Sequence, residues 1–331
     1  MSIVLAETTR DHHVENMYRG DVVVMDHNGD IITQLGNGNK TTYWRSAAKP
    51  FQVLPMLEAG GMETYGFSEK ELALMTSSHG GEAHHAETVA GILRKIGLSP
   101  ELLQCGAAMP MHQPEAFRIK EAGETWSVLH NCCSGKHSAM LALALLKGYT
   151  LEGYTEAAHP VQKDMLQIVS EMTNMDSSEI GVGIDGCGVP IFHMPLTAMA
   201  RAYAILSLPE ETCVPDRAAA LRRVAGAMSR YPWYVAGTNR LDTAIMEVTK
   251  GEILAKLGAD GVYCVSVLEE GIGIALKIES GDVRAIEPVI IELLNRLELL
   301  SEEEHNALKK RMDSGLYNHR KNLIGEIRAV F

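Results

Sequence analysis

The segment VVVMDHNGDIITQLG sets two apolar runs on either side of Asn28-Gly29. Asn-Gly is the dipeptide that best supports a two-residue hairpin turn, because it tolerates positive φ. The pattern predicts strands near residues 20–26 and 30–36 with a tight turn between them. A β-hairpin is therefore expected near the N-terminus.

Helical patterns dominate the middle of the chain. Proline is accepted in the first turn of a helix but not in its interior, so a helix through PFQVLPMLEAG must begin close to Ser46. A short strand is expected at ELALMTSS, which runs into Ser77 and Ser78. Helical spacing recurs in 86–96, 137–148, 159–174, 214–229, 286–299 and 302–312.

Strand character returns late in the chain. Residues 244–287 alternate β-rich runs with Gly, Asp and Ser at short intervals, as is typical of an antiparallel meander. The patterns together predict an α/β (α+β) fold of the αβα type. Its central antiparallel sheet is built from both ends of the chain, with a helical subregion between them. No linker rich in Pro, Ser or Gly marks a boundary, so we expect a single domain over residues 1–331.

Composition excludes several classes of protein. Lys and Arg total 30 against 42 Asp and Glu, a net charge of -12, which argues against a general nucleic-acid binder. No run of about eighteen apolar residues suggests a membrane span, and the N-terminus lacks a basic, apolar leader, so we expect a soluble, cytoplasmic protein. Six scattered cysteines predict reduced thiols rather than a disulfide framework.

Ser46-x-x-Lys49 is the first candidate for catalysis. Residues three apart share a helical face, so the hydroxyl and the amine are expected within hydrogen-bond reach. A lysine serves as a base only when burial or another cation favours its neutral form. Spacing alone equally fits an N-cap serine followed by a solvated lysine.

The segment TSSHGGEAHH, residues 76–85, is the second candidate. Small residues at a junction before a helix let a substrate approach the backbone, where free amides bind an anion or oxyanion. An ordinary glycine turn before a capped helix fits the pattern as well.

Lys256-Leu257-Gly258 in the late strand region is the third candidate. Serine β-lactamases carry Lys-Thr-Gly on such a strand, where the lysine places an ammonium beside the nucleophile. Leu257 lacks the hydroxyl of that threonine. In isolation the triplet also fits a strand lysine that faces solvent.

Cysteines in HNCCSGKHSAM (130–140) and DGCGVP (185–190) form the fourth candidate. Cys133 and Cys187 each lie in a glycine-containing turn, and Lys136 follows Cys133 by three residues. Thiolates bind zinc, and a metal ion can also deprotonate an amine ligand. Two buried thiols near a functional loop are the alternative.

Taken together, the sequence resembles the asparaginase II family, the rhizobial-type third structural class of L-asparaginases. The resemblance covers nearly the whole chain and rests on seven segments in family order. They are YRGDVVVMDHNGDI, WRSAAKPFQ, SSHGGEAHH, HNCCSGKH, GIDGCGVP, GTNRLDT and KLGADGVY. It implies a fold similar to serine β-lactamases and glutaminases, a homodimer, and serine-dependent hydrolysis of L-asparagine to L-aspartate and ammonia.

The resemblance also implies roles for individual residues. Ser46 pairs with Lys49 and Ser78 with Lys256, and either serine attacks the amide carbon after a neutral lysine takes its proton. Zinc supports substrate binding rather than chemistry. The implied zinc ligands are Cys133, Lys136 and Cys187, and the implied substrate-binding residues are Arg45, Asn131, His137 and Asp185.

Two positions depart from the family pattern, and three alternatives stay open. Cys132 stands where the family usually has Asn, and Gly80 where it often has Ser. The chain is alternatively a glutaminase or another amidase of this fold, since one methylene separates the two substrates. It is otherwise a non-catalytic metal or amino-acid sensor, or a hydrolase that uses zinc-bound water.

Overall fold

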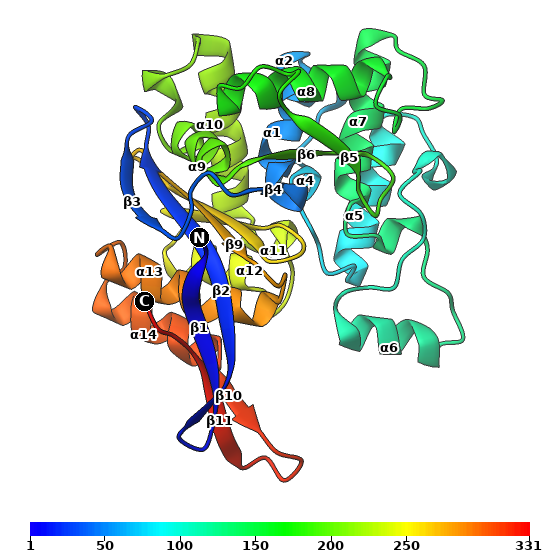
Figure 1. Ribbon diagram of the computed structural model, residues 1–331. Coiled ribbons are helices and arrows are strands. Elements are labelled where there is room, and N and C mark those ends of the chain that lie inside the picture. The colour runs from blue at the N-terminus through cyan, green and yellow to red at the C-terminus, as the bar shows by residue number, and fades with distance from the viewer. The chain divides into compact units, whose positions relative to one another are not determined.

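The computed structural model describes residues 1–331 as two compact units (Figure 1). The first, here the sheet unit, comprises Met1–Thr42, Met194–Leu208 and Ala244–Phe331. The second, here the helical unit, comprises Tyr43–His193 and Pro209–Thr243. Each unit is therefore assembled from segments far apart in the chain. The expectation of one family-type domain over residues 1–331 stays a prediction.

An antiparallel sheet forms the centre of the sheet unit, in the order β10-β11-β1-β2-β9-β8-β7 with β3 paired to β2. Its strands come from both ends of the chain, as the sequence predicts. The strands are β1 (Ile3–Arg10), β2 (His13–Asp26), β3 (Ile31–Leu35), β7 (Ile253–Leu257), β8 (Val262–Val267), β9 (Ile272–Ile278), β10 (Gly315–Tyr317) and β11 (Leu323–Ala329).

The predicted hairpin and the last two strands meet in this sheet. Gly29 has a φ of 94°, in the turn between β2 and β3, as the Asn28-Gly29 dipeptide predicts. Strand β1 pairs with β11 with Ala6 opposite Ala329, so the first and last strands lie side by side in Figure 1. Neither β10 nor β11 is apparent from the sequence patterns.

Three helices accompany the sheet: α9 (Leu196–Ser207), α13 (Ile286–Arg296) and α14 (Glu302–Arg311). Helix α9 packs on β9, where Gly273 leaves no side chain between the strand and the backbone of Ala200. Helix α13 packs against β1 and β11. The fold prediction of a mixed α/β structure with a central antiparallel sheet is confirmed.

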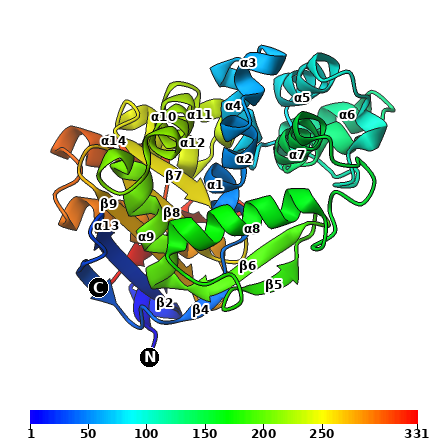
Figure 2. The same cartoon turned by 90° about the horizontal axis from the view of Figure 1, so that it is seen from above.

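In the helical unit, α7 (Ser134–Lys147) lies beside α5 (Ala83–Lys95) and contacts it (Figure 2). Residues 134–144 of α7 are all buried. Gly135 allows α7 to lie directly on the backbone of Leu74, because a Cβ there would collide with the carbonyl oxygen. The helices are α1 (Lys49–Gln52), α2 (Leu54–Glu58), α3 (Gly61–Tyr65), α4 (Glu69–Met75), α5 (Ala83–Lys95), α6 (Gln113–Glu121), α7 (Ser134–Lys147), α8 (Pro160–Thr173), α10 (Pro215–Arg230) and α11 (Pro232–Val235).

Three elements lie where the chain passes between the units. They are β4 (Thr41–Tyr43), β6 (Pro190–Pro195) and α12 (Leu241–Val248). Strand β5 (Gly181–Ile184) forms an antiparallel hairpin with β6. The turn of that hairpin contains Asp185 and Cys187. Backbone hydrogen bonds of Asp185 and Gly188 close this turn.

Two sequence predictions are wrong. The expected strand at ELALMTSS is helix α4, which begins at a capping box where the Ser68 hydroxyl accepts from the Glu71 backbone N–H. Its apolar residues are buried on all sides, so they show no helical alternation. The first part of the expected meander, around residues 244–248, belongs to helix α12 instead. The helix predicted through PFQVLPMLEAG is divided at Val53 into α1 and α2, and the other predicted helices are confirmed within a few residues at each end.

Candidate active site

Lys49 lies at the start of α1, directly after the single-turn helix Arg45–Ala48. Pro50 occupies the first turn, which fixes where the helix begins. The Lys49 side chain is fully buried. Its Nζ lies 2.5 Å from Ser77 O, 3.0 Å from Ser78 Oγ and 3.4 Å from Cys132 O. The amine therefore connects the serine segment with the cysteine loop.

The two candidate serines differ in their relation to Lys49. Ser78 is 6% exposed and accepts a hydrogen bond from the lysine. Ser46 is half-buried, and the three hydrogen bonds of the Lys49 amine go to other residues. The hydroxyl that the structure brings to Lys49 is thus that of Ser78, not the one three residues away in sequence.

The backbone at Ser78 is held by the last residue of α11. Ser78 N–H donates to Val235 O at 2.9 Å, so this amide already has a partner. Ser77 follows the end of α4 and its N–H donates to Leu74 O. These two bonds hold the backbone that carries the Ser78 hydroxyl.

Arg45 and Asp185 form an ion pair. Arg45 Nε and Nη2 each lie 3.0 Å from Asp185 Oδ1. Arg45 has a φ of 55°, a left-handed conformation that is unfavourable for a residue with a side chain. The pair places opposite charges together in the helical unit.

A second cluster combines thiols with charged groups. One ligand atom each of Cys133, Asp185 and Cys187 lies within 4.8 Å of the others. Lys136 Nζ donates to Cys187 Sγ at 3.3 Å. Cys132 Sγ lies 3.9 Å from Cys133 Sγ but is not part of that group of three.

This donor set suits zinc. Zinc binds thiolate, nitrogen and carboxylate ligands, and a sulfur and a nitrogen ligand of a tetrahedral ion lie about 3.6 Å apart. The distance from Lys136 to Cys187 is close to that value. Burial lowers the pKa of Lys136, but the neighbouring Cys133, Cys187 and Asp185 outweigh it and raise the pKa above its usual range, so the amine would bind zinc only by giving up its proton.

His137 is buried on α7, one residue after Lys136. Its Nδ1 lies 2.7 Å from the Tyr154 hydroxyl, and its Nε2 has no hydrogen-bond partner in the protein. Burial lowers the pKa of His137 to about 3. The imidazole is therefore neutral at physiological pH.

Asn131 holds the cysteine loop in place. Its Nδ2 donates to Cys105 O at 2.9 Å and to Gly106 O at 3.0 Å, while its Oδ1 accepts from Cys133 N–H at 2.9 Å. Through these bonds the Asn131 side chain orients the backbone at Cys133.

Lys256 lies in the sheet unit, on β7 and opposite Cys264 in the register. It is fully buried, and its Nζ donates to Leu257 O at 2.9 Å. Its pairing with Ser78 stays a prediction.

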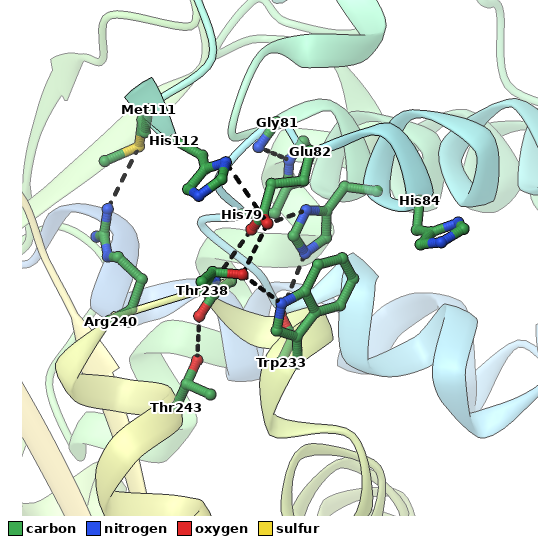
Figure 3. Close-up of polar contacts among 12 residues, drawn as sticks. His79, Gly81, Glu82, His84, Met111, His112, Trp233, Thr238, Arg240 and Thr243 are labelled. Atoms are coloured by element: carbon green, nitrogen blue, oxygen red, sulfur yellow. Dashed lines mark hydrogen bonds and ion pairs between the residues drawn. The ribbon is translucent and has the colours of Figure 1, made fainter. Parts of the chain in front are cut away.

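Sequence reasoning missed a polar network around His79, Glu82 and Thr238 (Figure 3). The Glu82 carboxylate accepts from Thr238 N–H at 3.0 Å and from the Thr238 hydroxyl at 2.7 Å, which ties the SSHGGE segment to the GTNRLDT segment. His79 Nε2 lies 2.9 Å from Ser134 Oγ, and its Nδ1 accepts from Gly81 N–H. Both segments belong to the family pattern, which was the available signal, but the sequence analysis gave no role to the Glu82 carboxylate or to Thr238.

His85 in this network predicts an acid-sensitive stability. Its ring stacks on Trp233 at 4.0 Å, and burial lowers the pKa of His85 from 6.5 to about 4 despite Glu82 nearby. The unfolded chain takes up this proton near pH 6.5 and the folded protein only near pH 4, so acid favours unfolding. The stabilisation is complete above about pH 6.5 and is lost toward pH 4, by about 3 kcal/mol.

Denaturant unfolding of the wild type and of His85→Phe across pH 4 to 7 measures this contribution. The variant is expected to show a shallower decline in unfolding free energy, because phenylalanine takes up no proton. His84→Gln is the matched control at the exposed neighbouring position and should keep the wild-type slope. Parallel slopes for the wild type and His85→Phe would refute the assignment.

Several solved structures are similar to the chain. A putative β-lactamase from Bacteroides dorei has 11% identity and a TM-score of 0.44, over 83% of this chain and 93% of its own. An octameric penicillin-binding protein homologue from Pyrococcus abyssi has 15% identity and a TM-score of 0.45, over 84% of this chain and 73% of its own. Mglu in its glutamate form has 14% identity and a TM-score of 0.39, over 85% of this chain and 61% of its own.

These structural likenesses are too distant to bear on function, and no curated protein matches the sequence significantly. No helix in the structure combines the length and the apolar character that a membrane span needs. The family model for L-asparaginase II matches residues 6–329, nearly the whole chain. The chain therefore belongs to the L-asparaginase II family, a family of amidohydrolases.

Proposed function

We propose that the protein hydrolyses the side-chain amide of L-asparagine through an ester on a serine. The observation that carries this proposal is the 3.0 Å hydrogen bond between the fully buried Lys49 amine and the Ser78 hydroxyl. A nucleophile and its base are expected within about 2.6–3.2 Å of each other. Ser78 is the proposed nucleophile and Lys49 the proposed base.

The reaction proceeds in two steps. Ser78 Oγ attacks the amide carbon while neutral Lys49 takes the hydroxyl proton, and ammonia leaves with that proton as the C–N bond breaks. Water then attacks the resulting aspartyl ester, gives a proton to Lys49, and releases aspartate. Lys49 returns the proton to Ser78 Oγ, so the enzyme ends in its starting state.

Arg45 and Asp185 are proposed to bind the two charges of the amino acid. Arg45 pairs with the α-carboxylate and Asp185 with the α-ammonium, because opposite charges form the strongest hydrogen bonds. These side chains contact each other in the structure. Substrate binding thus exchanges one internal ion pair for two external ones, which limits the net gain in affinity.

A zinc ion is proposed beside this site, held by Cys133, Lys136 and Cys187, with Asp185 within reach. Bound zinc supplies a fixed positive charge that orders the two loops. Asn131 positions Cys133 for this role through the backbone. Ser46 and Lys256 are proposed as supporting proton carriers, and the active form as a cytoplasmic homodimer.

Ammonia release from purified wild-type protein tests the proposal. L-Asparagine is expected to be turned over, with a higher kcat/KM than L-glutamine. Preference for glutamine would make the protein a glutaminase, since one methylene is worth about 1–3 kcal/mol in a pocket. Binding of aspartate without turnover of either amide would favour a sensor and reject the proposal.

A further inference from the structure

Tyr154 lies in the segment between α7 and α8, and the proposed chemistry does not use it. Its side chain is fully buried, and its ring meets the His137 ring edge-on at 5.6 Å. Gln162 Nε2 holds its backbone by a 2.8 Å hydrogen bond to Tyr154 O. The phenol is therefore fixed beside a residue of the proposed site.

The Tyr154 hydroxyl has two hydrogen-bond partners. Gln104 N–H lies 2.8 Å from the hydroxyl oxygen, and a backbone N–H can only donate. His137 Nδ1 lies 2.7 Å from the same oxygen. The hydroxyl accepts from Gln104, and its own hydrogen needs an acceptor.

Two arrangements of the protons are possible. If His137 Nδ1 carried the hydrogen and donated to the oxygen, the buried phenol O–H would have no acceptor. The His137 Nε2 lone pair would also lack a donor. If the phenol donates to Nδ1, only the N–H at Nε2 is without a partner. Because an unsatisfied buried polar group costs about 1–3 kcal/mol, the second arrangement is favoured.

We propose that Tyr154 is a positioning residue that holds His137 in the tautomer with hydrogen on Nε2. His137 then presents a fixed donor to a substrate oxygen. This proposal rests on the proposed amidase function for its substrate and adds the chemistry of the contact. A neutral N–H donates to a carbonyl or carboxylate oxygen, whereas an ammonium or an amide NH2 group offers it no acceptor.

The tautomer itself is tested by nitrogen NMR on full-length protein labelled with ¹⁵N-histidine. The His137 signals are identified by their loss in His137→Gln. In the wild type, Nε2 is expected to show the shift of a protonated ring nitrogen and Nδ1 that of an unprotonated one. In Tyr154→Phe the two shifts should move toward an average. Hydrogen on Nδ1 in the wild type overturns the proposal.

Kinetics and binding provide the second measurement. Tyr154→Phe keeps the ring and removes only the hydroxyl, so kcat/KM for asparagine is expected to fall about tenfold, the value of one hydrogen bond. Aspartate affinity, measured by calorimetry, should fall with it. Tyr149→Phe is the matched control, because its hydroxyl bonds Asp164 outside the site, and it should behave as wild type.

The outcomes separate this proposal from the proposed function. If the wild type hydrolyses neither amide, the function fails, and the NMR and aspartate affinity still decide the role of Tyr154. If the wild type is active and Tyr154→Phe keeps both wild-type kcat/KM and aspartate affinity, Tyr154 does not position His137.

Discussion

Replacing Ser78 by alanine is expected to lower kcat for ammonia release from asparagine by at least about 10³-fold, as losing a nucleophile does in other serine hydrolases. Lys49→Met should lower it by a similar factor, because the methionine side chain fills the buried site but takes up no proton. The double variant should be no worse than either single one, since the two groups act as one unit. Steady-state kinetics with thermal melting as a folding control measure this.

Ser46→Ala is the matched variant, because Ser46 is the serine that sequence spacing places beside Lys49. Its kcat is expected to fall by less than about tenfold if Ser46 only carries protons. Mass spectrometry after rapid quenching should find the aspartyl ester on the peptide that contains Ser78. An ester on Ser46, with Ser78→Ala still forming it, would reverse the assignment and make Ser78 the proton carrier.

Removal of the proposed zinc is expected to weaken substrate binding far more than it slows chemistry. Chelation, or Cys187→Ser, should reduce zinc from about one ion per chain to a trace and raise KM by at least about tenfold while kcat changes little. The reason is that the Cys187 turn also carries Asp185, whose carboxylate pairs with Arg45. Metal analysis, kinetics and melting temperature on the same samples separate these effects.

Cys213→Ser is the control for this experiment, because Cys213 is half-buried and lies outside the thiol cluster. It should keep the metal and the wild-type KM. Loss of kcat on chelation with KM unchanged would contradict a supporting role and favour zinc-bound water as the nucleophile. Zinc added back should restore KM in the chelated protein but not in Cys187→Ser.

Local sequence patterns predicted the elements whose cause is local. The Asn28-Gly29 turn and the start of the helix at Lys49 each depend on one residue's backbone preference. Helix α4 was mistaken for a strand because a helix buried on every face loses its periodic pattern, although its Ser68–Glu71 capping box is visible in the sequence. Strand β11 depends on a partner more than 300 residues away, and no local pattern encodes that pairing.

The candidate site was predictable as a set of residues but not as a set of contacts. The family segments point to Lys49, Ser78, Cys133 and Cys187, and the structure gives each a buried position. Which hydroxyl lies beside Lys49 depends on the packing of the loop after α4, which spacing does not describe. Tyr154 was missed because a single tyrosine in a turn carries no pattern, and its role follows only from its two partners.

The pairing of β1 with β11 has a consequence for synthesis of the chain. Translation at about 5–20 residues per second leaves β1 without its partner for on the order of 15 to 60 s. Most of the helical unit, Tyr43–His193, leaves the ribosome well before the last strand. During that interval the β1–β2 hairpin offers open edges to other nascent chains, and its charged tip at Arg10 and Glu15 discourages such pairing. The sheet unit can therefore complete its sheet only after β11 has been synthesised.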